Sequence, residues 1–184
     1  MMTDLGPVIR RASMSDAPAI ARIYNEGIAD RIATFETDPR SAADIEQQLR
    51  ERGDHFPTIV IEVAGSVVAW AGVGKYRDRA CYAGIGEHSV YVGRDARGQG
   101  YGLLALDALC AACADQGLWK LVSRILPENV ASLALHERAG FRVVGTYQRH
   151  GKLDGEWRDC VIVEKLLDPD TGHFATPTNG DIGQ

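Results

Sequence analysis

Three glycines at alternate positions, Gly98, Gly100 and Gly102, follow two arginines, Arg94 and Arg97. This combination can bind an anion, because glycine lets a ligand approach the backbone closely and arginine adds full positive charge. The spacing differs from that of a P-loop, which ends in Gly-Lys-Ser/Thr, and from the Gly-x-Gly-x-x-Gly of dinucleotide-binding folds. Glycine spacing alone leaves two interpretations open: a phosphate-binding loop, or a glycine-rich turn with solvated arginines.

The elements that must position this loop are a strand before it and a helix after it. Apolar and aromatic alternation predicts a strand over 89–92, and apolar periodicity predicts an amphipathic helix over 103–113. The first turn of a helix has N–H groups without intrahelical partners, and the helix dipole adds partial positive charge there. A phosphate or pyrophosphate can bind at such a terminus.

Arg97-Gly98-Gln99-Gly100-Tyr101-Gly102, placed between a strand and a helix, resembles the acetyl-coenzyme A signature of the GCN5-related N-acetyltransferase (GNAT) superfamily. The resemblance covers residues 8–167. It implies a single-domain α/β (α+β) fold with a central mixed, splayed sheet flanked by helices. It also implies that the loop amides hold the coenzyme pyrophosphate and that the strand Val90-Tyr91-Val92 meets the pantetheine arm.

Length and composition agree with one globular domain. The chain has 184 residues, of which 45% are hydrophobic and 24% charged. A formal net charge of −5 argues against a nucleic-acid partner bound by bulk phosphate attraction. The sequence shows neither a signal peptide nor a run long enough to span a membrane, so we expect no membrane partner and a cytoplasmic location.

The four cysteines do not suggest a metal site. Cys110 and Cys113 form a C-x-x-C, but it falls inside the alanine-rich helix, and no second Cys or His pair stands at zinc-ligand spacing. We interpret both as small buried apolar residues. Cys81 and Cys160 are expected to be reduced strand residues. No metal is therefore expected.

The remaining elements follow from periodicity and capping residues. Ser15 is the expected N-cap of a helix over 17–29, and Ser41 with Asp44 predicts a capping box for a helix through about Arg52. Gly84 and Gly86 suggest a bulge in a strand over 82–92, which would splay the sheet beside the loop. We expect a short lead at 1–7 and a mobile tail at 168–184. The other predicted strands cover 8–12, 58–63, 67–74, 121–126, 141–149 and 157–166, and a last helix covers 130–139.

Several segments narrow the resemblance to the phosphinothricin N-acetyltransferase group, which includes methionine sulfone/sulfoximine and arsinothricin acetyltransferases. The segments that resemble the whole group are Glu87–Val92, Pro127–Ser132 with His136, and Gly155–Asp159. Those that most resemble the arsinothricin branch are Arg31–Thr37, Cys81–Gly84 and Lys152–Asp159. The resemblance implies a small amino-acid-like substrate, acetyl-coenzyme A as cosubstrate and a homodimer.

Acetyl transfer to an amine needs the free base, so a proton acceptor is useful near neutral pH. A glutamate is too acidic for this task unless burial or a water relay helps. In the resembled group the glutamate at the position of Glu87 is the proposed general base, and we carry that role over. The alternative for Glu87 is an ordinary surface carboxylate.

The leaving thiolate benefits from a hydrogen bond or a proton. The resembled group has a histidine where many superfamily members have a tyrosine, which makes His136 the candidate acid. A lone helical histidine is often structural, so both roles stay open. Asn129 and Ser132 begin the same helix, where capping explains them; the resemblance adds contacts to the pantetheine arm.

An acidic substrate needs cationic partners, and arginine offers bidentate geometry. By resemblance, either Arg77 or Arg79 would take this role; the other would be a solvated turn arginine. Phe35, Tyr82 and Tyr91 match aromatic substrate-site positions of the group. For Phe35, a hydrophobic plug under the loop is the alternative.

We therefore expect direct, ternary-complex transfer of an acetyl group to the α-amino group of a phosphinothricin-, arsinothricin- or methionine sulfoximine-like amino acid. Two other functions remain: a protein or peptide N-acetyltransferase, which the arginines near the pocket disfavour, and a non-catalytic acyl-coenzyme A sensor, which the presence of Glu87 and His136 disfavours.

Overall fold

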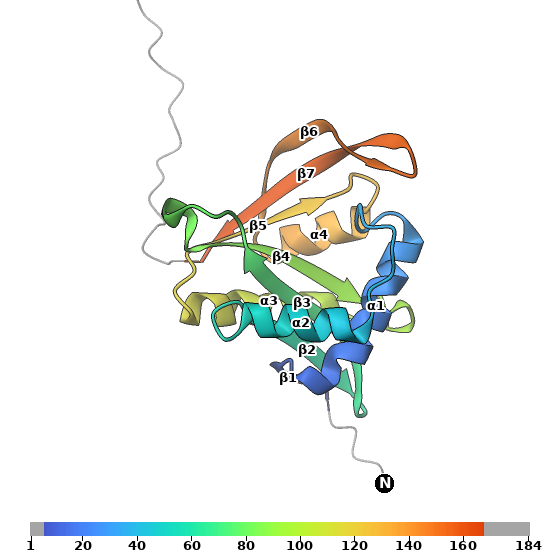
Figure 1. The fold of residues 1–184 in the computed structure, drawn as a ribbon, viewed down its shortest axis with the longest axis vertical. Coiled ribbons are helices and arrows are strands. Elements are labelled where there is room, and N and C mark those ends of the chain that lie inside the picture. Colours follow the sequence, from blue (N-terminus) through green and yellow to red (C-terminus); the bar gives the residue numbers. More distant parts are fainter. Residues whose placement is uncertain (1–5, 168–184) are drawn as a thin grey trace, which may run out of the picture.

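Residues 6–167 are described by a computed structural model, so the predicted tail at 168–184 and most of the predicted lead lie outside the described residues. One seven-stranded sheet runs in the order β1-β2-β3-β4-β5-β7-β6 (Figure 1). Neighbouring strands are antiparallel except β4 and β5, which are parallel. The predicted mixed sheet is confirmed. The strands are β1 (Val8–Arg11), β2 (Thr58–Val63), β3 (Ser66–Lys75), β4 (Ile85–Val92), β5 (Lys120–Ile125), β6 (Arg142–Leu153) and β7 (Glu156–Leu166).

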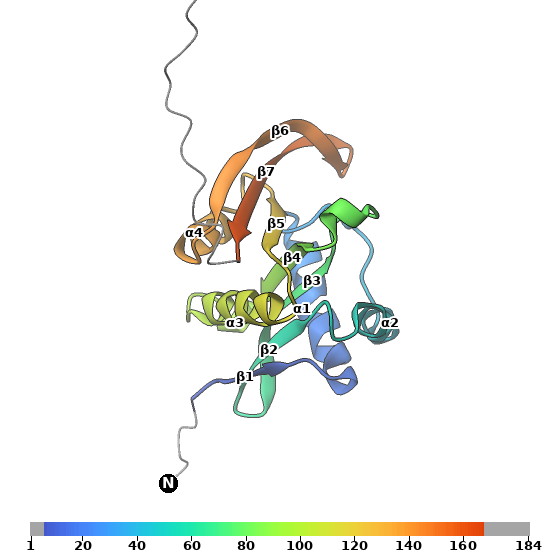
Figure 2. The same ribbon diagram turned by 90° about the vertical axis from the view of Figure 1, so that its left-hand side faces the viewer.

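Helices cover both faces of the sheet, as Figure 2 shows: α1 and α2 lie on one side, and α3 and α4 on the other. Each face buries its own apolar cluster. Ile20, Ile45 and Trp70 belong to the α1/α2 side, and Leu106, Leu109 and Val73 to the α3 side. The helices are α1 (Ala17–Asp30), α2 (Ala42–Arg52), α3 (Tyr101–Asp115) and α4 (Val130–Arg138). Within residues 6–167, no helix is long and apolar enough to cross a membrane.

The predicted capping box of α2 is confirmed, whereas the predicted N-cap of α1 is wrong. Ser41 Oγ accepts a hydrogen bond from the Asp44 backbone N–H, and the Asp44 carboxylate accepts one from the Ser41 N–H, as predicted. Ser15 is not the N-cap of α1. A 3-10 turn, Met14–Asp16, precedes the helix, because the buried Asp16 carboxylate binds back to the Ser13 N–H and to the Arg10 guanidinium.

The sheet splays between β4 and β5, but no bulge causes it. The register between β3 and β4 is unbroken, and the strand begins at Ile85, not at Tyr82. Gly84 precedes the strand, where the Trp119 ring packs on it so closely that a β-carbon would lie 1.9 Å from a ring atom. The parallel pairing of β4 with β5 ends at Glu87 and Val122, after which β5 pairs with β7 alone. The gap beyond Glu87 is the space in which a ligand can sit.

The cysteines are where the sequence suggested, with one exception. Cys110, Cys113 and Cys160 are buried, whereas Cys81 is exposed in the 3-10 turn Ala80–Tyr82 and is not a strand residue. Burial raises the pKa of the Cys110 and Cys113 thiols to about 11 and about 12. Both are therefore thiols packed in the α3 cluster.

Candidate active site

The glycine loop presents backbone N–H groups that the other described residues leave free. After the 3-10 turn Arg94–Ala96, Gly98 and Gly100 take the left-handed conformation, with φ of 76° and 86°. Among the described residues, no acceptor binds the N–H groups of 97–102; the first N–H bonded to the loop is that of Leu103, which donates to the Gly100 oxygen. This cluster at the N-terminus of α3 suits an anionic ligand.

Asp30 neutralises the two arginines of the loop, Arg94 and Arg97. The last residue of α1 forms ion pairs with both Arg94, at 2.8 Å, and Arg97, at 2.7 Å. Burial alone would raise the pKa of Asp30, but the hydrogen bonds from the two arginines outweigh it and lower that pKa. The arginines are therefore not free charges, and the loop amides are the principal unpartnered donors at this end of α3.

A groove of about 1220 Å³ runs from this loop between α1, β4, α3 and α4. Its lining includes every residue predicted to bind the coenzyme except Gln99: Val90, Tyr91, Val92, Arg97, Gly98, Gly100, Tyr101, Gly102, Asn129 and Ser132. The sequence analysis missed the part of the lining that other helices supply, namely Gly27, Asp30, Ile32 and Ala33 beside α1, and Ala131, Ala134, Leu135 and Arg138 on α4. No local motif distinguishes these residues.

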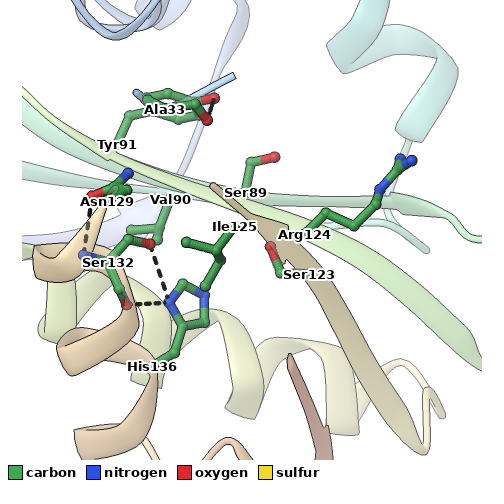
Figure 3. Close-up of a pocket in the computed structure, with 10 residues that line it drawn as sticks. All are labelled: Ala33, Ser89, Val90, Tyr91, Ser123, Arg124, Ile125, Asn129, Ser132 and His136. Atoms are coloured by element: carbon green, nitrogen blue, oxygen red, sulfur yellow. Dashed lines mark hydrogen bonds between the residues drawn. The ribbon is translucent and has the colours of Figure 1, made fainter. Parts of the chain in front are cut away.

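A smaller pocket of about 340 Å³ opens from the groove where β4 and β5 separate (Figure 3). Ala33, Val90, Tyr91, Asn129 and Ser132 line both spaces. The remaining lining residues are Ser89, Ser123, Arg124, Ile125 and His136. A long ligand in the groove can therefore place one end beside a small molecule in the pocket.

Glu87 stands at the last position where β4 and β5 pair, on the edge of this gap. Its side chain is 28% exposed. Both Nε and Nη2 of Arg124 contact Oε1 of Glu87, at 2.6 Å and 2.5 Å. Among the described residues, none donates a hydrogen bond to Oε2. That oxygen is available to a ligand, which is the property a proton acceptor needs.

His136 is buried, and both of its ring nitrogens have partners. Nδ1 lies 2.7 Å from the Ser132 backbone oxygen and 3.4 Å from Ser132 Oγ (Figure 3). Because a carbonyl only accepts, Nδ1 carries the proton, and the Nε2 of His136 accepts from the Nε2–H of His88 at 3.0 Å. His136 thus has no N–H directed at the groove, and any influence on a leaving group passes through Ser132.

The histidine pair predicts a specific acid sensitivity. Burial, then the charge of His136, lowers the pKa of His88 to about 3, and burial lowers that of His136. In the unfolded chain a histidine pKa is about 6.5. Since the native pKa is the lower one, the stabilisation is complete above pH ~6.5 and is lost as the pH falls toward the native value. Below pH ~6.5 the unfolded state gains protons that the native state cannot bind.

We expect the free energy of unfolding to fall less steeply with acid in a His88→Gln variant, by up to about 1.4 kcal/mol per pH unit. Denaturant titrations between about pH 7 and pH 5 measure this slope. His150→Gln, at an exposed position, is the matched control and should keep the original slope. Parallel curves for the wild type and His88→Gln would contradict the prediction.

The residues predicted to bind substrate are dispersed. Arg77 and Arg79 are both exposed in the β3–β4 connection and line neither space; Arg77 lies over the Tyr76 ring at 5.1 Å. Tyr82 packs edge-on against Tyr76. Phe35 packs against Gly151 of β6, where a β-carbon would lie 2.8 Å from its ring. Of the predicted set, Tyr91 alone lines the pocket.

Comparisons with known proteins agree with this geometry. Residues 8–142 match the family model described as an acetyltransferase (GNAT) domain. The chain is 35% identical to an L-methionine sulfoximine/L-methionine sulfone acetyltransferase of Pseudomonas paraeruginosa, over 88% of this chain and 95% of that protein. It is 33% identical to a phosphinothricin N-acetyltransferase of Alcaligenes faecalis, over 86% and 82%. The structure resembles a GNAT superfamily phosphinothricin acetyltransferase from Sinorhizobium meliloti, solved in complex with acetyl-coenzyme A, with a TM-score of 0.81, 30% identity and coverage of 95% and 94%.

Proposed function

This chain belongs to the GNAT acetyltransferase family, and on that premise we propose that it acetylates the α-amino group of a small amino-acid analogue. Acetyl-coenzyme A is the acetyl donor. The observation that supports the acceptor class is the small pocket that opens from the groove, since a small molecule there would lie beside the end of a ligand bound in the groove. The names of the relatives, for methionine sulfoximine, methionine sulfone and phosphinothricin, point to the same class.

The groove fits the coenzyme on the evidence of its own unpartnered groups. The N–H groups of 97–102 would hold the pyrophosphate, and the edge of β4 at Val90–Val92 would lie along the pantetheine arm. Asn129, whose side chain caps α4 by accepting from the Ser132 N–H, and Ser132 itself face the same groove. The thioester of the bound coenzyme supplies the activated acetyl group. Gln99 does not line the groove, so its contribution would come from its backbone.

Glu87 is our candidate general base, with Oε2 as the accepting atom. Its other oxygen is held by Arg124, which lines the pocket, whereas Glu87 itself does not. On the leaving side, His136 binds the backbone oxygen of Ser132, and the Ser132 hydroxyl is a group able to donate into the groove. None of the described cysteines lines either space, which supports direct attack in a ternary complex.

The test is release of free coenzyme A with a panel of acceptors: phosphinothricin, arsinothricin, methionine sulfoximine, methionine sulfone, glutamate and a short peptide. We expect at least one glutamate-like analogue to be strongly preferred over the peptide. Preference for arsinothricin would support the branch suggested by the sequence. Release only with the peptide would assign the protein to protein acetylation, and release with none, despite coenzyme binding, would favour a sensor.

We further propose a homodimer, and the exposed apolar side chains of the β6–β7 hairpin support it. Val143, Val144, Tyr147 and Trp157 are each at least 50% exposed, and β6 is an edge strand. Light scattering should give twice the mass of one chain, and Tyr147→Asp should lower the measured mass toward that of a single chain. Val8→Asp, on the opposite edge strand β1, is the control. A single-chain mass for the wild type would refute the dimer. A cytoplasmic location also remains a prediction.

A further inference from the structure

The side chain of Arg52 packs on the sheet, a contact that the sequence does not predict. It is the last residue of α2, and its side chain extends over β3 where Gly72 and Gly74 leave the sheet without side chains. A β-carbon on Gly72 would lie 2.6 Å from Nη1 of Arg52, and one on Gly74 would lie 3.9 Å from Nε. Any larger residue at 72 would displace the guanidinium. The two glycines thus form a slot that holds the Arg52 side chain.

Within residues 6–167, the charge of Arg52 has no counter-ion. Among the described residues, its one hydrogen-bond partner is neutral: Nη1 donates to Thr58 Oγ1 at 3.2 Å. Among residues 6–167, no carboxylate pairs with it, whereas Arg10, Arg22, Arg40, Arg50, Arg94, Arg97, Arg124 and Arg158 all have acidic partners. Burial lowers the pKa of Arg52 to about 10, so the group remains a cation at neutral pH. A partly buried cation without an anion is a site that an anionic ligand can complete.

The sheet register places Arg52 on the same face as the candidate base. Directly paired residues of antiparallel strands share a face, and so do alternate residues of one strand. Gly72 pairs with Ser89 and Gly74 pairs with Glu87. Arg52 therefore lies on the face of the sheet that carries Glu87 and Ser89. Ser89 lines the pocket. Arg52 is partly buried, and its Nε and Nη2 atoms, which have no partner among the described residues, are not fully buried, so a ligand can reach them.

We propose that Arg52 is the specificity-determining residue that binds the oxyanion of the acceptor, either its α-carboxylate or its side-chain acid. This proposal rests on the proposed function. The guanidinium fork matches the two oxygens of a carboxylate, phosphinate or arsinate. Binding supplies the missing counter-charge and holds the acceptor above the face that carries Glu87. Arg77 and Arg79, which the sequence favoured for this task, are exposed in the β3–β4 connection. Like Arg52 they do not line the pocket, but Arg52 lies over Gly72 and Gly74, which pair with Ser89 and Glu87.

The kinetic test compares Arg52→Met with Arg50→Met, a matched control two residues earlier in α2 whose arginine pairs with Glu46 on the surface. We expect Arg52→Met to raise the KM of phosphinothricin at least tenfold, with the KM of acetyl-coenzyme A and kcat unchanged. Methionine sulfone, which has only the α-carboxylate, identifies which oxyanion is bound: its KM rises only if that group is the ligand. The KM of the α-amide of methionine sulfone, which has no carboxylate, should be the same in Arg52→Met as in the wild type. Equal KM changes for the amide and phosphinothricin, or none for either acid, would overturn the proposal.

Two further measurements separate this role from packing. Because Arg52 is an unpaired charge, its replacement by Met should leave the unfolding temperature unchanged or higher; a large loss would indicate a structural role. Arg52→Lys, which keeps the charge without the fork, should give an intermediate KM. Phosphinothricin should also raise the unfolding temperature of the wild type and not that of Arg52→Met. If Arg52→Met acetylates phosphinothricin with an unaltered KM for it, the Arg52 proposal alone fails. If phosphinothricin stabilises the wild type but not Arg52→Met, and no acceptor is acetylated, the proposed function alone fails. No stabilisation of the wild type would overturn the Arg52 proposal.

Discussion

Glu87→Gln is expected to lower kcat by roughly 10²–10⁴-fold while the KM of acetyl-coenzyme A stays the same. The substitution preserves size and shape but removes the oxygen that can accept a proton from the attacking amine. The coenzyme groove is formed by other residues, so donor binding should not change. Steady-state kinetics with the preferred acceptor, varying each substrate in turn, measure both parameters.

Arg124→Met is the control for Glu87→Gln, because Glu87→Gln also breaks the ion pair with Arg124. Arg124→Met breaks the same pair but leaves the carboxylate intact, and it should cost far less in kcat. If the two variants lose kcat equally, the ion pair and not proton acceptance is what the reaction needs. An unchanged kcat in Glu87→Gln would exclude Glu87 as the base.

Gly100→Asp is expected to weaken acetyl-coenzyme A binding on the order of 100-fold, with a corresponding rise in its KM. The new carboxylate would stand within the cluster of free N–H groups and repel the pyrophosphate. At about 4 Å and an effective dielectric of about 20, such repulsion amounts to about 4 kcal/mol, of which part is relieved by movement. Calorimetric titration with coenzyme A measures the affinity directly.

Gly117→Asp separates this repulsion from backbone strain. Gly117 and Gly100 have similar φ angles, 80° and 86°, and a β-carbon at either position meets no atom within 4 Å. The two substitutions therefore impose comparable strain in the left-handed region. Gly117 follows the other end of α3 and does not line the groove. Equal losses of coenzyme affinity in the two variants would show that the loop amides do not bind the pyrophosphate.

Much of the local architecture follows from short stretches of sequence. The capping box at Ser41 and Asp44, the hairpin turn at Ala64 and Gly65, and the free N–H groups after Arg97 depend on residues within a few positions of one another. The errors are local as well. Tyr82 was assigned to a strand and Ser15 to a cap, because the contacts that decide otherwise, of Trp119 with Gly84 and of Arg10 with Asp16, involve other elements.

The sequence by itself determined the glycine loop between a strand and a helix and the order of the elements around it, because these depend on neighbouring residues and on periodicity. The pyrophosphate role of the loop and the base role of Glu87 came from the family resemblance of the surrounding motifs. Only the tertiary structure decided how charges and protons are distributed there. Asp30 neutralises Arg94 and Arg97 across more than 60 residues, His88 occupies the free nitrogen of His136, and Arg52 reaches the face of Glu87. Such pairings depend on which elements pack together, and a residue's own surroundings in the chain do not encode that.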